Sequence, residues 1–281
     1  MTLPTHADIA RRSNTFVFGK GPQTLLCAHG FCSQQRMFRH QVRDFHFRAT
    51  HRIVTYDLAG FGQSDPQLWS AQRHARLEGY AEDMLRLIDE LDLHDITLLG
   101  ASMSAMVGVL AALQRPERFK ALVFIGASPR YLDDGAYIGG FRQADVDAFY
   151  DLVRLQHDWA AALSSMMLNQ PASWALHDVI DDISAVRVDV VRVVARAIFQ
   201  SDYRSLLAQV RQPVLITQTC ADRVVPVSVG HYLQQTLPKA QLTFMPGAGH
   251  LPNFTEPDVF NHTLRTFLAS VEAMNSSSLT Q

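Results

Sequence analysis

The chain has 281 residues, of which 47% are hydrophobic and 19% charged, and its formal net charge is -2 at pH 7. This composition excludes an intrinsically disordered protein, and the length is enough for one large α/β domain with a substantial core. Because positive charge is not in excess, nothing in the composition attracts nucleic acid or an anionic membrane surface. We therefore expect neither of them as a partner.

The amino-terminal segment and the cysteines bear on the compartment. Residues 1–14 contain no apolar signal segment, and no later apolar run is long enough to cross a bilayer. Cys27, Cys32 and Cys220 have no CxxC spacing, which favours reduced thiols over a disulfide framework or a zinc site. Together these features predict a cytoplasmic protein.

Short apolar segments of strand character alternate with helical patterns along most of the chain. Residues 77–91 have apolar positions at helical spacing, and residues 103–114 are apolar on nearly all sides, as in a buried helix. The alternation predicts a mostly parallel sheet that is covered by helices on both faces. The expected strands lie near Thr24, Ile53, Ile96, Val123, Leu215 and Phe244.

The alternation stops between residues 131 and 205. Helical patterns occupy residues 145–156, 159–168 and 186–199, and no strand is expected before Pro213. A helical insertion in a parallel sheet is typical of a cap over the carboxyl edge, where such folds bind ligands. We therefore predict a single domain, residues 1–281, with an all-helical cap, residues 131–205, inserted after the sixth strand.

The sharpest local signal is the segment LLGASMSA, residues 98–105, where an apolar strand enters a turn of small residues and opens into a buried helix. A nucleophile elbow needs this context, because the turn holds its serine, here Ser102, in strained backbone geometry. The helix N-terminus behind it offers amides and a positive dipole end to a developing oxyanion. Ser104 replaces the usual second glycine, so a merely tight structural turn is the alternative when this segment is taken by itself.

Two further residues complete a catalytic pattern. Asp222 follows the strand expected near Leu215, and His250 follows the strand expected near Phe244, in a loop fixed by glycine and proline. Serine, aspartate and histidine in this chain order are typical of α/β-hydrolases. The imidazole can accept the serine proton while the carboxylate holds its tautomer. The sequence therefore predicts a catalytic triad of Ser102, Asp222 and His250.

An oxyanion hole needs a second backbone amide from the loop after an early strand. The segment from Leu25 to Phe31 supplies such a loop, and we assign the backbone N–H groups of Phe31 and Met103 as the donors. We expect the ring of His29 to brace this loop rather than to take part in the chemistry.

Other motifs are better interpreted as structural features than as binding sites. Gly60 and Gly62 lack the full GxGxxG spacing, so a tight turn is expected and no nucleotide cofactor is implied. The twelve histidines include no HExxH motif and no cluster with metal-ligand spacing, so no metal is expected. The arginines at positions 187, 192 and 196 are expected on the solvated face of a cap helix.

Several segments, taken together, carry a resemblance to a known family. They are HGF at 29–31, LEGYAEDML at 77–85, SMSAMVGVLAALQRPERF at 102–119, IGASPRYLDD at 125–134, GGF at 139–141 and GHLP at 249–252. On these segments the chain resembles the RsbQ-type α/β-hydrolases, which include a bacterial stress-response regulator and the plant strigolactone and karrikin receptors.

The resemblance implies an α/β-hydrolase fold whose cap of helical hairpins covers a small hydrophobic pocket. It implies slow serine hydrolysis of small esters or lactones, which known members couple to signalling through a protein partner. By position it places four residues on the pocket wall, namely Trp159, Leu163, Phe199 and Val224. Ala101, Cys32 and Leu163 depart from residues common in the family, so the identity of the ligand does not carry over.

Two functions remain open at this point. In the first, the protein is a serine hydrolase that acts on small apolar esters or lactones through an acyl-enzyme. In the second, it is a ligand-sensing regulator whose cap binds a signalling protein such as a PAS-containing phosphatase or cyclase. A purely structural role would leave the triad unexplained. A haloalkane dehalogenase is disfavoured because its elbow needs a carboxylate, whereas position 102 is serine.

Overall fold

The computed structural model describes residues 8–48, 50–155, 159–169 and 174–278, in which seven strands form one sheet in the order β1-β3-β2-β4-β5-β6-β7. Every pairing is parallel except that of β1 with β3. The strands are β1 (Phe16–Phe18), β2 (Gln23–Ala28), β3 (His51–Tyr56), β4 (Ile96–Ala101), β5 (Phe119–Ile125), β6 (Val214–Thr219) and β7 (Ala240–Met245).

The six strands expected from the sequence are all present, and the predicted α/β-hydrolase fold class is confirmed. Every residue of β4 and β6 is buried, as expected of parallel strands that are covered by helices on both faces. The antiparallel edge strand β1 was missed. It has only three residues, too few to show an alternating pattern.

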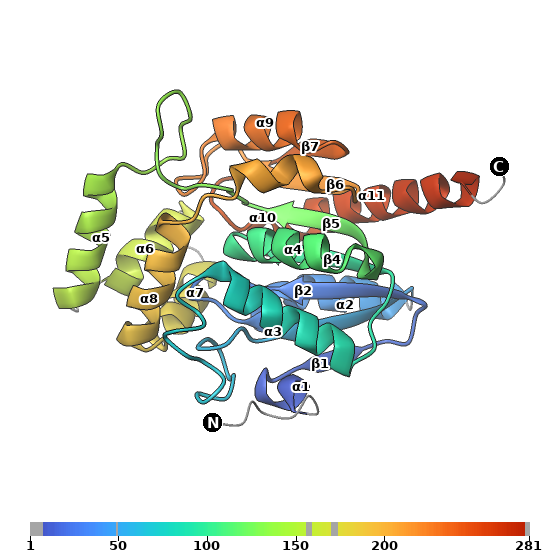
Figure 1. Ribbon diagram of the computed structural model, residues 1–281, viewed down its shortest axis with the longest axis horizontal. Coiled ribbons are helices and arrows are strands. Elements are labelled where there is room, and N and C mark those ends of the chain that lie inside the picture. Colours follow the sequence, from blue (N-terminus) through green and yellow to red (C-terminus); the bar gives the residue numbers. More distant parts are fainter. Residues whose placement is uncertain (1–7, 49, 156–158, 170–173, 279–281) are drawn as a thin grey trace.

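Helices cover both faces of the sheet (Figure 1). Helices α3 and α4 lie side by side on one face, whereas α2 and α11 lie together on the other. Helix α4 is buried from its first residue to Ala112, as its apolar sequence predicts. The helices outside the long insertion are α1 (Ile9–Arg12), α2 (Arg39–Arg48), α3 (Leu77–Glu90), α4 (Met103–Gln114), α9 (Val227–Thr236), α10 (Pro252–Thr255) and α11 (Pro257–Ser278), with short 3-10 turns at Gln35–Phe38, Pro116–Arg118 and Arg204–Gln209.

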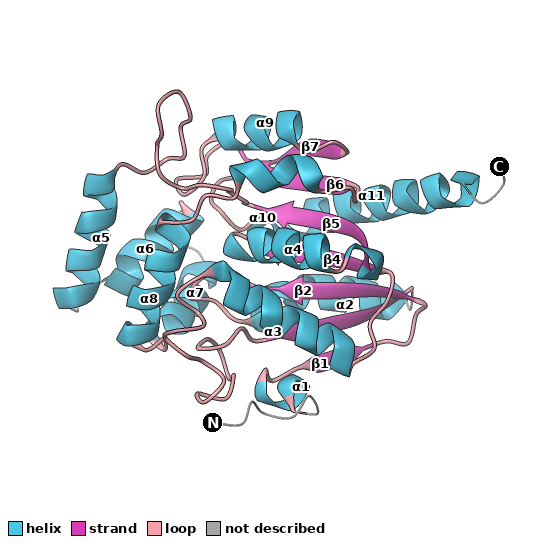
Figure 2. Ribbon diagram, in the orientation of Figure 1, coloured by secondary structure: helices cyan, strands magenta, loops and turns pink. Residues whose placement is uncertain are grey.

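Four helices separate β5 from β6 and lie beyond the arrowheads of the parallel strands (Figure 2). They are α5 (Gln143–Leu155), α6 (Trp159–Leu168), α7 (Trp174–Ser184) and α8 (Val188–Phe199), and we call them the helical cap. The insertion follows the fifth strand, β5, so the prediction that it follows the sixth is wrong. That prediction requires two strands before β2, and the described chain has only β1 there. Residues 1–7, 49, 156–158, 170–173 and 279–281 of the predicted domain and cap lie outside the described residues.

Helix α7 was not among the helices predicted from the sequence. Its segment WALHDVIDDIS has apolar residues at helical spacing, at positions 176, 179, 180 and 183, with three aspartates on the remaining positions. No helix in the described ranges has both the length and the apolar character that a bilayer span requires.

Candidate active site

Ser102 stands at the junction of β4 and α4. Its backbone has φ +54° and ψ -120°, in the half of the φ range that non-glycine residues rarely adopt. The N–H of Ser102 donates to the carbonyl of Ile125 at 2.8 Å, so the neighbouring strand β5 holds the strained residue in place. This is the strained strand-to-helix turn that the sequence predicts for a nucleophile elbow.

Asp222 and His250 are brought together as predicted. The carboxylate Oδ2 of Asp222 lies 2.8 Å from Nδ1 of His250, and both side chains are buried. The other oxygen, Oδ1, accepts the backbone N–H groups of Val224 at 2.7 Å and Val225 at 3.1 Å. A carboxylate held in this way orients the imidazole and favours the tautomer with its proton on Nδ1. Nε2 is then the atom free to accept a proton.

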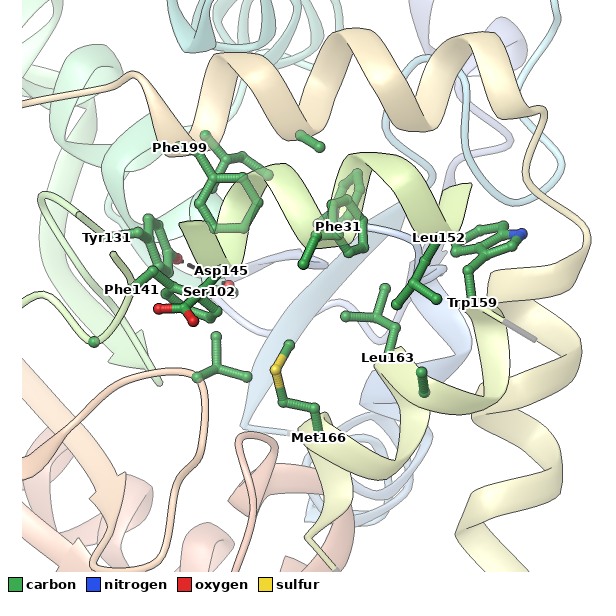
Figure 3. Close-up of a pocket in the computed structure, with 17 residues that line it drawn as sticks. Phe31, Ser102, Tyr131, Phe141, Asp145, Leu152, Trp159, Leu163, Met166 and Phe199 are labelled. Atoms are coloured by element: carbon green, nitrogen blue, oxygen red, sulfur yellow. Dashed lines mark hydrogen bonds between the residues drawn. The ribbon is translucent and has the colours of Figure 1, made fainter. Parts of the chain in front are cut away.

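The contact between Ser102 and His250, which the predicted triad requires, differs from the expectation. Nε2 of His250 is buried and has no hydrogen-bond partner among the described residues, so the Ser102 to His250 hydrogen bond is not formed. The hydroxyl of Ser102 instead lies 3.1 Å from the hydroxyl of Tyr131 (Figure 3). Burial raises the pKa of Tyr131, which keeps this phenol neutral and able to donate or accept.

Hydrogen bonds to backbone groups, from several elements, fix the histidine loop. The N–H of His250 donates to the carbonyl of Met167 in the cap at 2.6 Å, and Thr219 donates to the carbonyl of Gly249 at 2.6 Å. Gly126, at the end of β5, has φ +57°, and a Cβ there would lie 2.7 Å from Nδ1 of His250. Only glycine therefore allows the strand to approach the imidazole so closely.

The two residues assigned as oxyanion donors both lie near Ser102. Met103 is the first residue of α4, where the N–H has no acceptor inside the helix. Phe31 follows β2 and lines the same cavity as Ser102. His29 is buried, and its ring contacts the carbonyl of Gly30 and the N–H of Leu58, as the predicted bracing role requires.

A cavity of about 480 Å³ opens above Ser102 beneath the cap. Trp159, Leu163, Phe199 and Val224, the four residues expected on the pocket wall, all line it (Figure 3). Sequence reasoning did not assign further lining residues that include Tyr131, Phe141, Phe149 and Met166. Two of them lie in segments that carry the family resemblance, since Tyr131 is part of GASPRYLDD and Phe141 ends GGF.

The cavity wall is almost entirely apolar. Asp145 is its one charged residue among those described, and its carboxylate accepts the N–H of Arg142 at 2.8 Å and the Nε of the same residue at 3.2 Å. Because that negative charge is already paired with a guanidinium, the cavity suits an uncharged apolar ligand.

The glycine-rich segment after β3 is a turn, as expected. The carboxylate of Asp57 accepts the N–H groups of Gln35 at 2.8 Å and Gln63 at 2.9 Å, and a Cβ at Gly62 would lie 2.4 Å from that carboxyl carbon. A turn wrapped around a buried carboxylate offers nothing to a phosphate. In the described ranges no group of three or more His, Cys, Asp or Glu side chains is placed to hold a metal ion.

Comparison with known proteins agrees with this architecture. Residues 23–257 match the family model described as alpha/beta hydrolase fold. The chain is 36% identical to the karrikin insensitive 2 receptor CA of Petunia hybrida, over 88% of this chain and 92% of the relative. It is 31% identical to the strigolactone esterase D14 of Arabidopsis thaliana, over 93% and 98%. The solved structure of a hydrolase from Oleispira antarctica matches with a TM-score of 0.90 at 28% identity, over 96% and 99% of the two chains.

The chain is therefore an α/β-hydrolase. Within that fold it belongs to the family of the plant karrikin and strigolactone receptors, so the plant half of the resemblance noted in the sequence is confirmed.

Proposed function

We propose that the protein hydrolyses small apolar carboxylic esters or lactones through Ser102, His250 and Asp222. The observation that carries the proposal is the buried pair of Asp222 and His250. Nε2 of His250 has no partner among the described residues, and the strained Ser102 follows a strand of the same sheet. A buried imidazole with one nitrogen held by a carboxylate and the other without a partner is suited to accept a proton.

The reaction starts when the Ser102 side chain turns from Tyr131 toward His250. Oγ attacks the carbonyl carbon of the ester, its proton passes to Nε2, and the negative charge moves to the carbonyl oxygen. The N–H groups of Phe31 and Met103 stabilise that oxygen. Collapse of the intermediate breaks the bond to the leaving alkoxide, which takes the proton from Nε2 and leaves an acyl-enzyme.

Water completes the cycle by the same steps. His250 takes a proton from the water, whose oxygen attacks the acyl carbon. Collapse then breaks the bond to Ser102, which recovers its proton from Nε2, and the carboxylic acid is released. With a lactone, the alcohol and the acid leave as one hydroxy acid. The apolar wall and the volume of about 480 Å³ favour a small uncharged substrate over a charged or polymeric one.

Hydrolysis of p-nitrophenyl acetate tests this proposal. We expect the wild-type protein to release nitrophenol with a burst of about one equivalent, since acylation precedes slow deacylation. Ser102→Ala should lose the burst and the turnover, whereas Ser205→Ala, which changes an exposed serine in the 3-10 turn after the cap, should keep both. Turnover by folded Ser102→Ala at the wild-type rate would refute the proposal.

The second candidate function is that of a ligand-sensing regulator, and it is favoured by the names of the relatives as receptors. In this case the cap would bind a signalling protein after the cavity is filled. A pull-down with wild type and Ser102→Ala discriminates, because a regulator should retain a specific partner whose binding depends on the state of the site. Absence of a partner with both proteins would exclude this function. The class of the partner and a cytoplasmic location stay predictions.

A further inference from the structure

The orientation of a single peptide decides whether Phe31 can act as an oxyanion donor. The carbonyl of Gly30 and the N–H of Phe31 belong to one planar trans peptide, so the two bonds point in opposite directions. Nδ1 of His29 lies 2.8 Å from that carbonyl oxygen. A hydrogen bond at the carbonyl therefore also fixes the direction of the N–H on the other side of the peptide.

The neighbours of His29 identify Nδ1 as the donor. The N–H of Leu58, just after β3, donates to Nε2 at 2.9 Å, so Nε2 carries no proton. Burial lowers the pKa of His29, which keeps the ring neutral and leaves its single proton on Nδ1. The ring thus connects the end of β3 to the loop after β2 with a defined tautomer.

Ser104 holds the preceding peptide of the same loop. Its fully buried hydroxyl, in the first turn of α4, donates to the carbonyl of His29 at 2.5 Å. That carbonyl belongs to the peptide joining His29 to Gly30, so two successive peptides are held, one by the elbow helix and one by the ring. The glycine that usually occupies position 104 in the elbow motif has no side chain to make this bond.

The flexibility of Gly30 explains why the loop needs the hydrogen bonds from Ser104 and His29. A Cβ at this residue would lie 3.2 Å from Cβ of Ser102, so the loop rests against the nucleophile and glycine gives it the closest approach. Glycine also adopts a wider range of backbone angles than other residues, so the peptide after it could rotate its N–H away from the site.

We propose that Ser104 and His29 are positioning residues that keep the N–H of Phe31 directed at the carbonyl oxygen of an ester bound at Ser102. This inference rests on the proposed hydrolase function. It predicts that Ser104 acts on the transition state, in which the oxygen carries negative charge, much more than on the bound substrate.

Two substitutions at Ser104 test the inference. Ser104→Ala and Ser104→Gly both remove the hydroxyl. Glycine is the residue of the usual motif, so Ser104→Gly would keep full activity if only the size of residue 104 mattered. We expect kcat on p-nitrophenyl acetate to fall about tenfold in each variant, whereas KM changes less than about twofold. The loss in kcat is smaller than the factor of about 10² to 10³ that follows deletion of an oxyanion donor. Labelling by a fluorophosphonate, which builds negative charge on a phosphoryl oxygen, should slow in parallel.

Ser201→Ala is the matched control, because Ser201 is also buried and donates to a backbone carbonyl, that of Ile198, at 2.7 Å. We expect it to keep kcat within about twofold of wild type although it loses a similar buried hydrogen bond. Wild-type kcat in either folded Ser104 variant, or a loss confined to KM, would overturn the inference. An inactive, unlabelled wild-type protein would instead reject the proposed hydrolase function itself.

Discussion

The sheet edge and the helical cap meet at one cavity but are held in different ways. At the sheet edge, backbone hydrogen bonds fix Ser102 and His250, and two N–H groups fix the carboxylate of Asp222. The cap contributes mainly apolar side chains, such as Leu163 and Phe199. Bonds to backbone groups do not depend on neighbouring side chains, whereas an apolar wall changes with each substitution. Backbone contacts of the sheet edge therefore hold Ser102 and Asp222, and the cap supplies much of the apolar cavity wall as well as the carbonyl of Met167 that accepts from His250.

The contacts that fasten the cap to the core reinforce this contrast. In α7, Asp182 accepts the side-chain amide of Gln34 at 2.6 Å and the guanidinium of Arg36 at 2.5 Å, and Asp178 pairs with Arg39 at 2.8 Å. These are side-chain contacts, several of them partly exposed, and such pairs are weak and sensitive to salt. These salt-sensitive contacts are those of α7, whereas α6 is joined to the core by the backbone bond from the N–H of His250 to the carbonyl of Met167.

The largest expected effect falls on the sheet edge. Asp222→Asn keeps the shape of the side chain but removes the charge and can donate to Nδ1, which favours the wrong tautomer of His250. We expect kcat on p-nitrophenyl acetate to fall by about 10⁴ with the fold intact. A loss of less than about tenfold in a folded variant would show that the carboxylate does not orient the imidazole.

A cap substitution should change selectivity rather than chemistry. Leu163→Ala enlarges the cavity, and we expect the ratio of kcat/KM for p-nitrophenyl hexanoate over acetate to rise about tenfold, in the range that one hydrophobic contact supplies. The unfolding free energy should fall by about 2 to 3 kcal/mol, because Leu163 is buried but already faces open space. An unchanged ratio would remove Leu163 from the substrate wall.

Tyr131 lies where the sheet edge and the cap meet, beside Ser102 in the cavity. Tyr131→Phe removes the hydroxyl that holds Ser102, so the serine is released toward His250. One hydrogen bond is worth about 1 kcal/mol, and we therefore expect fluorophosphonate labelling to accelerate about fivefold. Slower labelling would mean that the phenol assists the reaction instead of competing for the serine.

The smallest effect concerns the stability of the loop after β2. Burial lowers the pKa of His29, so the unfolded chain binds a proton below about pH 6.5 that the folded chain does not bind. Because the unfolded state then binds more protons, this group makes stability fall as the pH decreases through about 6.5, by at most about 1.4 kcal/mol per pH unit.

Urea unfolding at pH 7.5 and 5.5 measures that effect. His29→Gln lacks the titrating ring, and we expect it to lose about 1 kcal/mol less than wild type between the two pH values. His51, whose pKa burial also lowers, stays in both proteins and so serves as an internal reference. Equal losses in the two proteins would contradict the assignment of a neutral buried ring to His29.

The sequence predicted the sheet edge better than the cap, for a physical reason. Parallel strands end at a common edge, so Ser102, Asp222 and His250 could be placed from strand order before any coordinates. The hydroxyl of Tyr131 next to Ser102 depends on how the chain turns into the cap, and no local spacing encodes that turn. Helix α7 was missed although its apolar residues recur at helical spacing. Two of the aspartates between them contact arginines of the core, which only the folded chain brings near.

Mass spectrometry after treatment with a fluorophosphonate shows whether Ser102 is a nucleophile that depends on His250. We expect one adduct per wild-type chain, on the peptide that contains Ser102, and none on folded His250→Ala over the same period. A folded wild-type protein without the adduct, or equal labelling of the His250→Ala protein, would contradict this expectation.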